Sequence, residues 1–170
     1  MQQLEIVHVF DGTPDDYLAV IDAEDFPAML CARLNLKERT LLLREDRGDH
    51  VFVQWKVLPT ADIPGPVKAA LGGKGLSFIE EERQPKARPH HREWNVLLEA
   101  LGPKRFRCSG TFDLVPEGGG TRRILKGEVD VKLLGVGGIV EKHVARGMVE
   151  SYEKTSTLVR AGIAARHSAR

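Results

Sequence analysis

The sequence predicts an α+β fold in which a curved antiparallel sheet of seven strands wraps around one long C-terminal helix. Three observations lead to this prediction. Most segments before residue 135 alternate between apolar and polar residues, which is typical of antiparallel strands with one dry and one wet face. Polar or glycine-rich turns separate these segments. Only residues 135–165 form a helical pattern long enough to cover the dry face of such a sheet.

The composition indicates one domain, with its core at about residues 4–165, and disfavours several function classes. Hydrophobic residues make up 42% of the 170 residues, and 25 basic against 24 acidic residues leave a net charge of +1. Nothing in this balance points to nucleic acid or to an anionic membrane. We see no signal peptide and no apolar stretch that would span a bilayer, so a cytoplasmic protein without integral membrane contact is expected. Cys31 and Cys108 are too few for a disulfide framework and are expected to be buried free thiols.

The N-terminal region is expected to form one strand and two short helices. Residues 4–10 alternate, but the pattern leaves open which set faces inward: Ile6, His8 and Phe10, or Val7 and Val9. Thr13 followed by Pro14 is typical of a helix start, because the threonine hydroxyl can accept from free backbone N–H groups. Asp25 is expected to start the second helix.

Six further strands are predicted at residues 36–45, 51–58, 76–82, 91–100, 105–114 and 125–133. The polar turn at 46–49 indicates a hairpin between the first two. Three prolines make 59–66 a connection, and residues 66–71 are expected to form no more than one or two helical turns, ended by 72–75. The inward or outward register of 36–45 and 76–82 stays open.

The last helix has an apolar stripe that polar residues interrupt. The stripe consists of residues at helical spacing: Val140, Val144, Met148, Ser151, Thr155, Leu158, Val159 and Gly162. Ser151 and Thr155 have two interpretations: their hydroxyls bond back to their own helix, or they hold the polar end of a bound molecule. Gly147 borders the stripe, and a helical glycine often marks close approach or needed room.

Two local motifs carry a resemblance to a known superfamily. The segment 126–143, KGEVDVKLLGVGGIVEKH, is similar to a small bacterial branch of unknown function in which a strand runs through a Pro-x-x-Gly-Gly turn into a helix and a glutamate. Gly137, Gly138 and Glu141 match that pattern, while Leu134 stands at the proline position. The opening 10–14, FDGTP, is also similar. With its order of elements, nearly the whole chain resembles the START-like, or polyketide-cyclase-like (SRPBCC), superfamily, which implies a helix-grip fold with a cavity for a hydrophobic molecule.

The candidate binding residues are the inward positions of the strands and of the last helix. On the helix they are Val144, Gly147, Met148, Ser151, Tyr152 and Thr155. On the sheet they are Trp55, Phe78, Trp94, Phe106, Gly110, Phe112, Gly127 and Val129. We expect Gly110 and Gly127 to leave space inside the sheet. Tight packing without a void is the competing interpretation.

We expect the chain to bind, carry or sense a small hydrophobic or amphipathic ligand, lipid-like or polyketide-like. A cyclase or dehydratase acting on a polyketide-like substrate is one alternative, and Glu80, Glu82 and Arg92 could serve it if they face inward, although a solvated role is favoured. A co-chaperone-like interaction module is another, which would need an apolar patch on the convex face. No catalytic residue, metal or cofactor is assigned, and the oligomeric state stays open.

Other motifs in the sequence have simple structural interpretations. The segment 135–138 lacks the third glycine of a dinucleotide fingerprint, and 72–75 lacks the spacing of a P-loop. His90 and His91 are adjacent, so on a strand they would point to opposite faces rather than bind one metal. The basic segment 83–92 is expected to be a solvated hairpin.

Overall fold

The computed structural model describes residues 1–60, 63–73 and 75–170. Its elements in chain order are β1 (Gln2–Phe10), α1 (Pro14–Ile21), α2 (Phe26–Arg33), β2 (Leu36–Asp46), β3 (His50–Pro59), α3 (Gly65–Ala70), β4 (Phe78–Pro85), β5 (His91–Leu97), β6 (Phe106–Glu117), β7 (Gly120–Val131) and α4 (Gly137–Ser168). The predicted order is confirmed, and α3 corresponds to the one or two helical turns expected at residues 66–71. The parts of the predicted connections that fall on residues 61, 62 and 74 lie outside the described residues.

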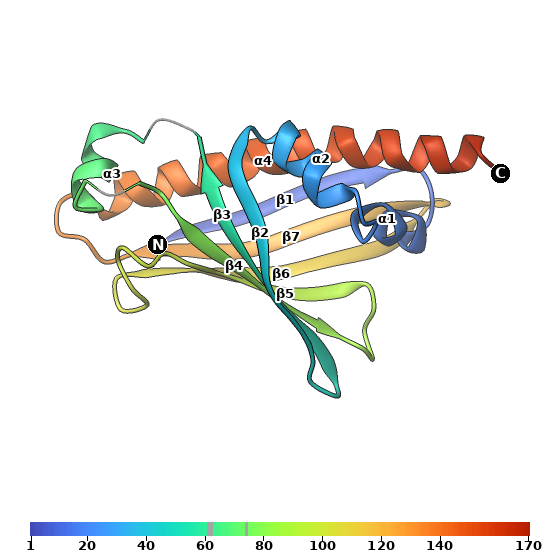
Figure 1. Cartoon of the computed structure of the whole chain (residues 1–170), viewed down its shortest axis with the longest axis horizontal. Coiled ribbons are helices and arrows are strands. Elements are labelled where there is room, and N and C mark those ends of the chain that lie inside the picture. Colours follow the sequence, from blue (N-terminus) through green and yellow to red (C-terminus); the bar gives the residue numbers. More distant parts are fainter. Residues whose placement is uncertain (61–62, 74) are drawn as a thin grey trace.

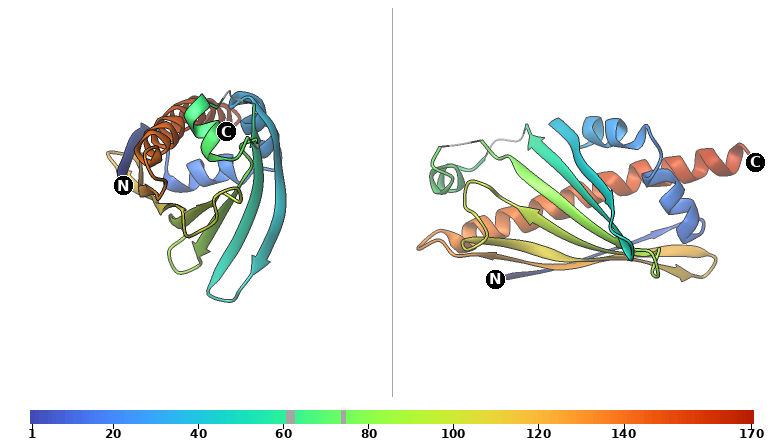
Figure 2. Two further views of the ribbon diagram at one scale, coloured as in Figure 1. Left: turned by 90° about the vertical axis from the view of Figure 1, so that its left-hand side faces the viewer. Right: turned by 60° about the horizontal axis from the view of Figure 1, so that its bottom comes forward.

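The strands form one antiparallel sheet in the order β1-β7-β6-β5-β4-β3-β2, so β1 and β2 are its edges. Figure 1 shows β1, β7 and β6 running along α4, while β2 and β3 run at a steep angle to them. The view along the helix in Figure 2 shows how far the sheet bends around α4. This is the curved α+β helix-grip architecture that the sequence predicted.

The start of α1 shows the predicted cap. The Thr13 hydroxyl accepts from the backbone N–H of Asp16 at 3.1 Å, and the Asp16 carboxylate accepts from the backbone N–H of Thr13 at 2.9 Å. This reciprocal pair satisfies two N–H groups that the first helical turn leaves without partners. The backbone N–H of Thr13 is also the main cause that lowers the pKa of Asp16 to about 2.

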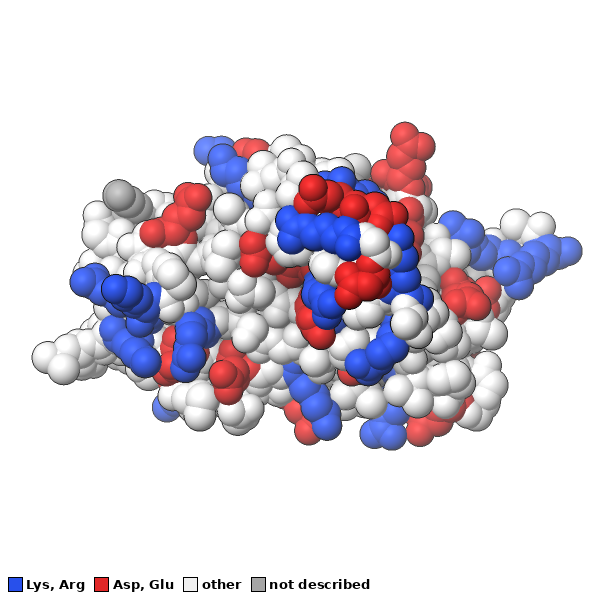
Figure 3. All heavy atoms as spheres, turned by 90° about the horizontal axis from the view of Figure 1, so that it is seen from below, with Lys and Arg blue, Asp and Glu red and all other residues white. Residues whose placement is uncertain are grey.

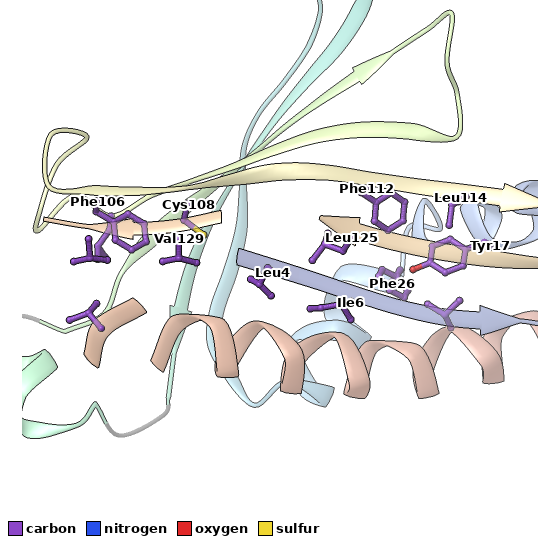
Figure 4. Close-up of a cluster of buried hydrophobic side chains, with 14 of the residues drawn as sticks. Leu4, Ile6, Tyr17, Phe26, Phe106, Cys108, Phe112, Leu114, Leu125 and Val129 are labelled. Carbon is purple, nitrogen blue, oxygen red and sulfur yellow. The ribbon is translucent and has the colours of Figure 1, made fainter. Parts of the chain in front are cut away.

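The apolar core lies between α4 and the half of the sheet formed by β1, β6 and β7. Figure 4 shows its side chains converging from these strands toward the helix and α1. The two possible registers of β1 are resolved in favour of Ile6, His8 and Phe10, which are buried together with Leu4. Helix α1 closes against α4 so tightly that a Cβ on Gly162 would lie 2.6 Å from the side chain of Val20.

The glycine and glutamate motif at the end of β7 is a structural joint between that strand and α4. Gly135 has φ +78°, and a Cβ on Gly137 would lie 2.3 Å from the carbonyl oxygen of Val131. The carboxylate of Glu141, which is buried, accepts from the backbone N–H of Val131 at 2.9 Å. The motif therefore ends the ladder and fixes the direction in which the helix leaves the sheet.

Replacing Glu141 by alanine should lower the free energy of unfolding by about 1–3 kcal/mol, because the buried N–H of Val131 loses its acceptor. Glu141→Gln keeps an oxygen at the same place and should cost less. Urea unfolding followed by circular dichroism measures both. Equal losses in the two variants would show that the charge, and not the hydrogen bond, matters at this joint.

Candidate functional site

The inner face of the sheet has two halves that differ in burial. On β1, β6 and β7, the inward side chains are buried: Leu4, Ile6, Phe10, Cys108, Phe112, Leu125 and Val129. On β3 to β5, Val53 and Val57 are also buried, but the other inward side chains keep part of their accessible surface: Trp55, Phe78, Glu80, Glu82, Arg92, Trp94 and Val96. An inward side chain that stays accessible borders space that protein atoms do not fill.

The position of α4 explains this difference. The helix packs against β1 and β7 and against the three shorter helices, and Figure 2 shows β2, β3 and β4 bending away from it. On α4 itself, Met148, Ser151, Tyr152 and Thr155 remain half-buried. A hollow of about 270 Å³ lies beside the start of β4, lined by Gly75, Ser77, Glu99 and Ala100.

The predicted role of Gly110 and Gly127 as makers of open space is wrong. The indole of Trp94 lies against both glycines, and a Cβ on Gly127 would lie 2.4 Å from its ring. The indole N–H is also engaged, since it donates to the carbonyl of Thr111 at 3.1 Å. The missing side chains of the two glycines let the indole approach the strands closely. Both glycines also border a groove of about 590 Å³, whose lining includes Lys126 of the outer face.

Alanine at Gly127 should destabilise the fold by roughly 1–3 kcal/mol or more, because the new methyl group meets the Trp94 ring and the carbonyl of Ser109. Alanine at Gly147 should instead stabilise it by about 0.5–1 kcal/mol, since nothing lies within 4 Å of the new Cβ in the helix. Thermal unfolding of the two variants compares them directly. A tolerated Gly127→Ala would contradict the packing described for Trp94.

The remaining predicted binding residues fall into distinct groups. Phe106, Phe112 and Val129 are buried in the core and do not border the open side of the interior. Gly147 is exposed. Thr155 donates its hydroxyl to the carbonyl of Ser151 at 2.7 Å, so it follows the first of the two interpretations and bonds to its own helix.

The structure also places the two remaining candidate residues of α4, both cysteines and one serine that was not predicted. Val144 is half-buried, and the sulfur of Met148 lies 3.9 Å from that of Cys108. Cys108 is a buried free thiol as predicted, and burial raises its pKa to about 12. Cys31 is also a free thiol, but the prediction that it is buried is wrong, because it is only half-buried. The sequence analysis missed Ser156, which is fully buried and donates to the carbonyl of Glu153 at 2.9 Å.

Charged side chains lie on the inner face of β4 and β5, where part of their surface stays accessible. The sequence had left open whether these side chains point inward. Glu80 and Glu82 of β4 and Arg92 of β5 share the inward face with Trp55 and Trp94. Arg92 pairs with Glu82 at 3.2 Å and with Asp22 at 3.0 Å. The solvated role favoured from the sequence is therefore not what the structure shows.

The second inner ion pair joins Glu80 to Arg39 of β2, at 3.2 Å. Desolvation raises the pKa of the Glu80 carboxyl against the opposing charge of Arg39, yet its side chain keeps 36% of its accessible surface. The raised pKa and the exposed fraction together show that the Glu80 carboxyl is only partly shielded from solvent. Burial, followed by the negative charge of Glu80, raises the pKa of Tyr152 on α4.

The raised pKa of Glu80 gives a pH dependence of stability with a definite sign. Between its ordinary value of 4.5 and the raised pKa, the folded protein holds a proton that the unfolded chain has released. The free energy of unfolding should therefore fall as the pH rises through this window. Urea unfolding at several pH values should show a flatter slope for Glu80→Gln than for the parent protein, and identical slopes would contradict a desolvated Glu80.

A fully buried arginine, Arg123 of β7, organises the other end of the interior. It donates to the Tyr17 hydroxyl at 2.9 Å, to Nδ1 of His8 at 2.7 Å and to the carbonyl of Tyr152 at 3.2 Å. His8 in turn contacts the Glu153 carboxylate at 2.9 Å. These contacts tie together β7, α1, β1 and α4. Arg123 was not among the residues predicted from the sequence, although the alternation that turns Leu125 inward also turns inward the residue two positions before it.

The polar loops have partners of their own. His90 contacts Asp15 at 2.8 Å and His91 contacts Asp113 at 2.6 Å, so the two imidazoles serve different carboxylates. Lys86, in the basic segment, pairs with Asp46 at 2.7 Å. Within residues 1–60, 63–73 and 75–170, no three His, Cys, Asp or Glu side chains gather as metal ligands would, and no helix has the length and apolar character to cross a membrane.

Solved structures with the same architecture cover nearly the whole chain. The protein TTHA0849 from Thermus thermophilus is 19% identical with a TM-score of 0.63, over 97% of this chain and 99% of the other. The Zhui aromatase/cyclase from Streptomyces sp. R1128 is 12% identical with a TM-score of 0.65, over 97% and 94%. The di-domain ARO/CYC StfQ from the steffimycin biosynthetic pathway is 14% identical with a TM-score of 0.63, over 98% of this chain and 52% of that one.

These likenesses establish the fold, which is one that aromatase/cyclases use. A search of curated proteins gave no significant match. The model of one family, described as "Protein of unknown function (DUF2505)", matches residues 5–162. That match spans β1 to α4, including the joint formed by Gly137 and Glu141, and the chain therefore belongs to the DUF2505 family.

Proposed function

We propose that this protein binds a small hydrophobic or amphipathic molecule between α4 and strands β3 to β5, and that it carries or senses this molecule in the cytoplasm. One observation carries the proposal: inward side chains on β3, β4, β5 and α4 stay accessible, while the same face of β1, β6 and β7 is buried. Natural cores are packed to high density, so a cluster of inward side chains that stay accessible indicates space that the protein itself does not fill.

The walls of this space suit an amphipathic molecule. Trp55, Phe78, Trp94 and Met148 offer apolar surface, and covering it contributes roughly 25 cal/mol per Å². Glu80 and Tyr152 add polar groups within the same region. The likeness in fold to two structures named as aromatase/cyclases supports a site for a small molecule.

A cyclase or dehydratase on a polyketide-like substrate is the second candidate function. The inward Glu80, with its pKa raised by burial, favours it because a carboxyl with a raised pKa can exchange protons nearer neutral pH. Native mass spectrometry of the gently purified protein separates the two functions. Under the binding proposal, a co-purified molecule keeps its mass on prolonged incubation, whereas a change in mass would favour the enzyme.

The co-chaperone alternative has less support. Figure 3 shows basic and acidic side chains interspersed over the face away from α4. On the same outer face, Glu81 of β4 accepts from Gln54 at 2.7 Å and from Asn95 at 2.9 Å. Such a polar, internally bonded surface does not favour apolar docking.

Blocking the proposed space should weaken binding of a neutral apolar dye. Ser151→Trp places an indole at a half-buried position of α4 and should weaken the fluorescence response to Nile red by about tenfold or more, equivalent to the loss of about 1.4 kcal/mol. Glu150→Trp adds the same ring at the neighbouring exposed position and should leave the response unchanged. Equal responses from both folded variants, or no response from the parent protein, would contradict the proposal.

A further inference from the structure

We infer that the bound molecule is held at its polar end through hydrogen bonds that it donates, as an alcohol, a phenol or an ammonium group does, and that a carboxylate in the same place is disfavoured. The inference rests on the proposed function and specifies the chemistry of its ligand. The expected polar group follows from the two inner ion pairs, Glu80 with Arg39 and Glu82 with Arg92, and from which of their side chains stay accessible.

The two inner ion pairs hide their donors and present their acceptors. The side chains of Arg39 and Arg92 keep 10% and 13% of their accessible surface, while those of their partners Glu80 and Glu82 keep 36% and 25%. The Arg39 guanidinium also lies over the Trp55 ring, 4.1 Å from its centre. A molecule that enters this space therefore meets carboxylate oxygens before it meets guanidinium N–H groups.

Each carboxylate has one oxygen engaged and one available. Oε2 of Glu80 accepts from Arg39 at 3.2 Å, and Oε2 of Glu82 accepts from Arg92 at 3.2 Å and from Gln84 at 3.0 Å. Among the described residues, none donates to Oε1 of either glutamate. An ionised carboxylate is a pure acceptor with about four lone-pair sites, so these oxygens require donors from the occupant.

Other groups near the space do not reverse this preference. Trp94 uses its N–H for the carbonyl of Thr111. Arg123 is fully buried behind Tyr17 and Tyr152 and contacts them directly, so its charge is not presented to an occupant. Tyr152 has a hydroxyl that can donate or accept. A ligand carboxylate would meet Glu80 and Glu82 with charge of the same sign, which is unfavourable in a partly desolvated site.

Three ligands with one apolar body and different polar ends test the inference. We would measure binding of 2-naphthol, 2-naphthylmethylammonium and 2-naphthoate to the full chain at pH 7.5 by ligand-observed NMR titration. Charge-assisted hydrogen bonds are worth enough for naphthol and the ammonium compound to bind about tenfold more tightly than naphthoate. Naphthoate binding as tightly as either would overturn the inference while leaving the proposed function in place. Failure of all three to bind would overturn the proposed function as well.

Two variants of one strand connect the preference to the inner carboxylates. Glu80→Gln removes the inner charge and should reduce the preference over naphthoate by about tenfold. Glu81→Gln changes the neighbouring residue, which bonds to Gln54 and Asn95 on the outer face, and should leave the preference unchanged. Circular dichroism confirms that each variant is folded, and Glu82→Gln repeats the test if Glu80→Gln fails to fold. Equal effects of the inner and outer variants would overturn the assignment.

Discussion

The packing of a single long helix onto one half of a bent sheet is the constraint on which the rest of the structure depends. Helix α4 uses Val140, Val159 and Ile163 to seal the interior on the side of β1 and β7. A sheet that bends so strongly carries β3, β4 and β5 away from that contact, as Figure 2 shows. The side chains on their inner face are then neither sealed by the helix nor turned to bulk solvent. Both the proposed binding space and its polar groups follow from this geometry.

The sequence was sufficient to predict the architecture because its strongest signals are periodic. Alternation of apolar and polar residues predicted β6 and β7, and apolar residues at helical spacing predicted α4. The polar turn before β3 predicted the hairpin. The sequence did not show which residues face inward in three strands, β1, β2 and β4. In each of them a polar residue occupies an inward position: His8, Arg39 and Glu80. Those residues form the polar interior, so the sequence was ambiguous where the candidate site departs from an ordinary core.

Glycine shows why the detailed lining could not be read from sequence. In the sequence, Gly127 and Gly147 both indicate room, yet the first is covered by an indole from a neighbouring strand and the second is exposed on the helix. Whether a missing side chain leaves space depends on what its neighbours across the sheet place there. Trp94 lies far from Gly127 along the chain and reaches it only through the pairing of β5, β6 and β7. Periodicity carries no information about such a contact.

The proposed function requires that the interior between α4 and strands β3 to β5 is hollow. Crystals of the protein pressurised with xenon test it most directly, because xenon enters apolar internal space and is visible in anomalous diffraction. The account predicts a xenon atom bordered by Trp55, Trp94 and Met148. Electron density that shows these side chains in mutual contact, with no xenon among them, would contradict it.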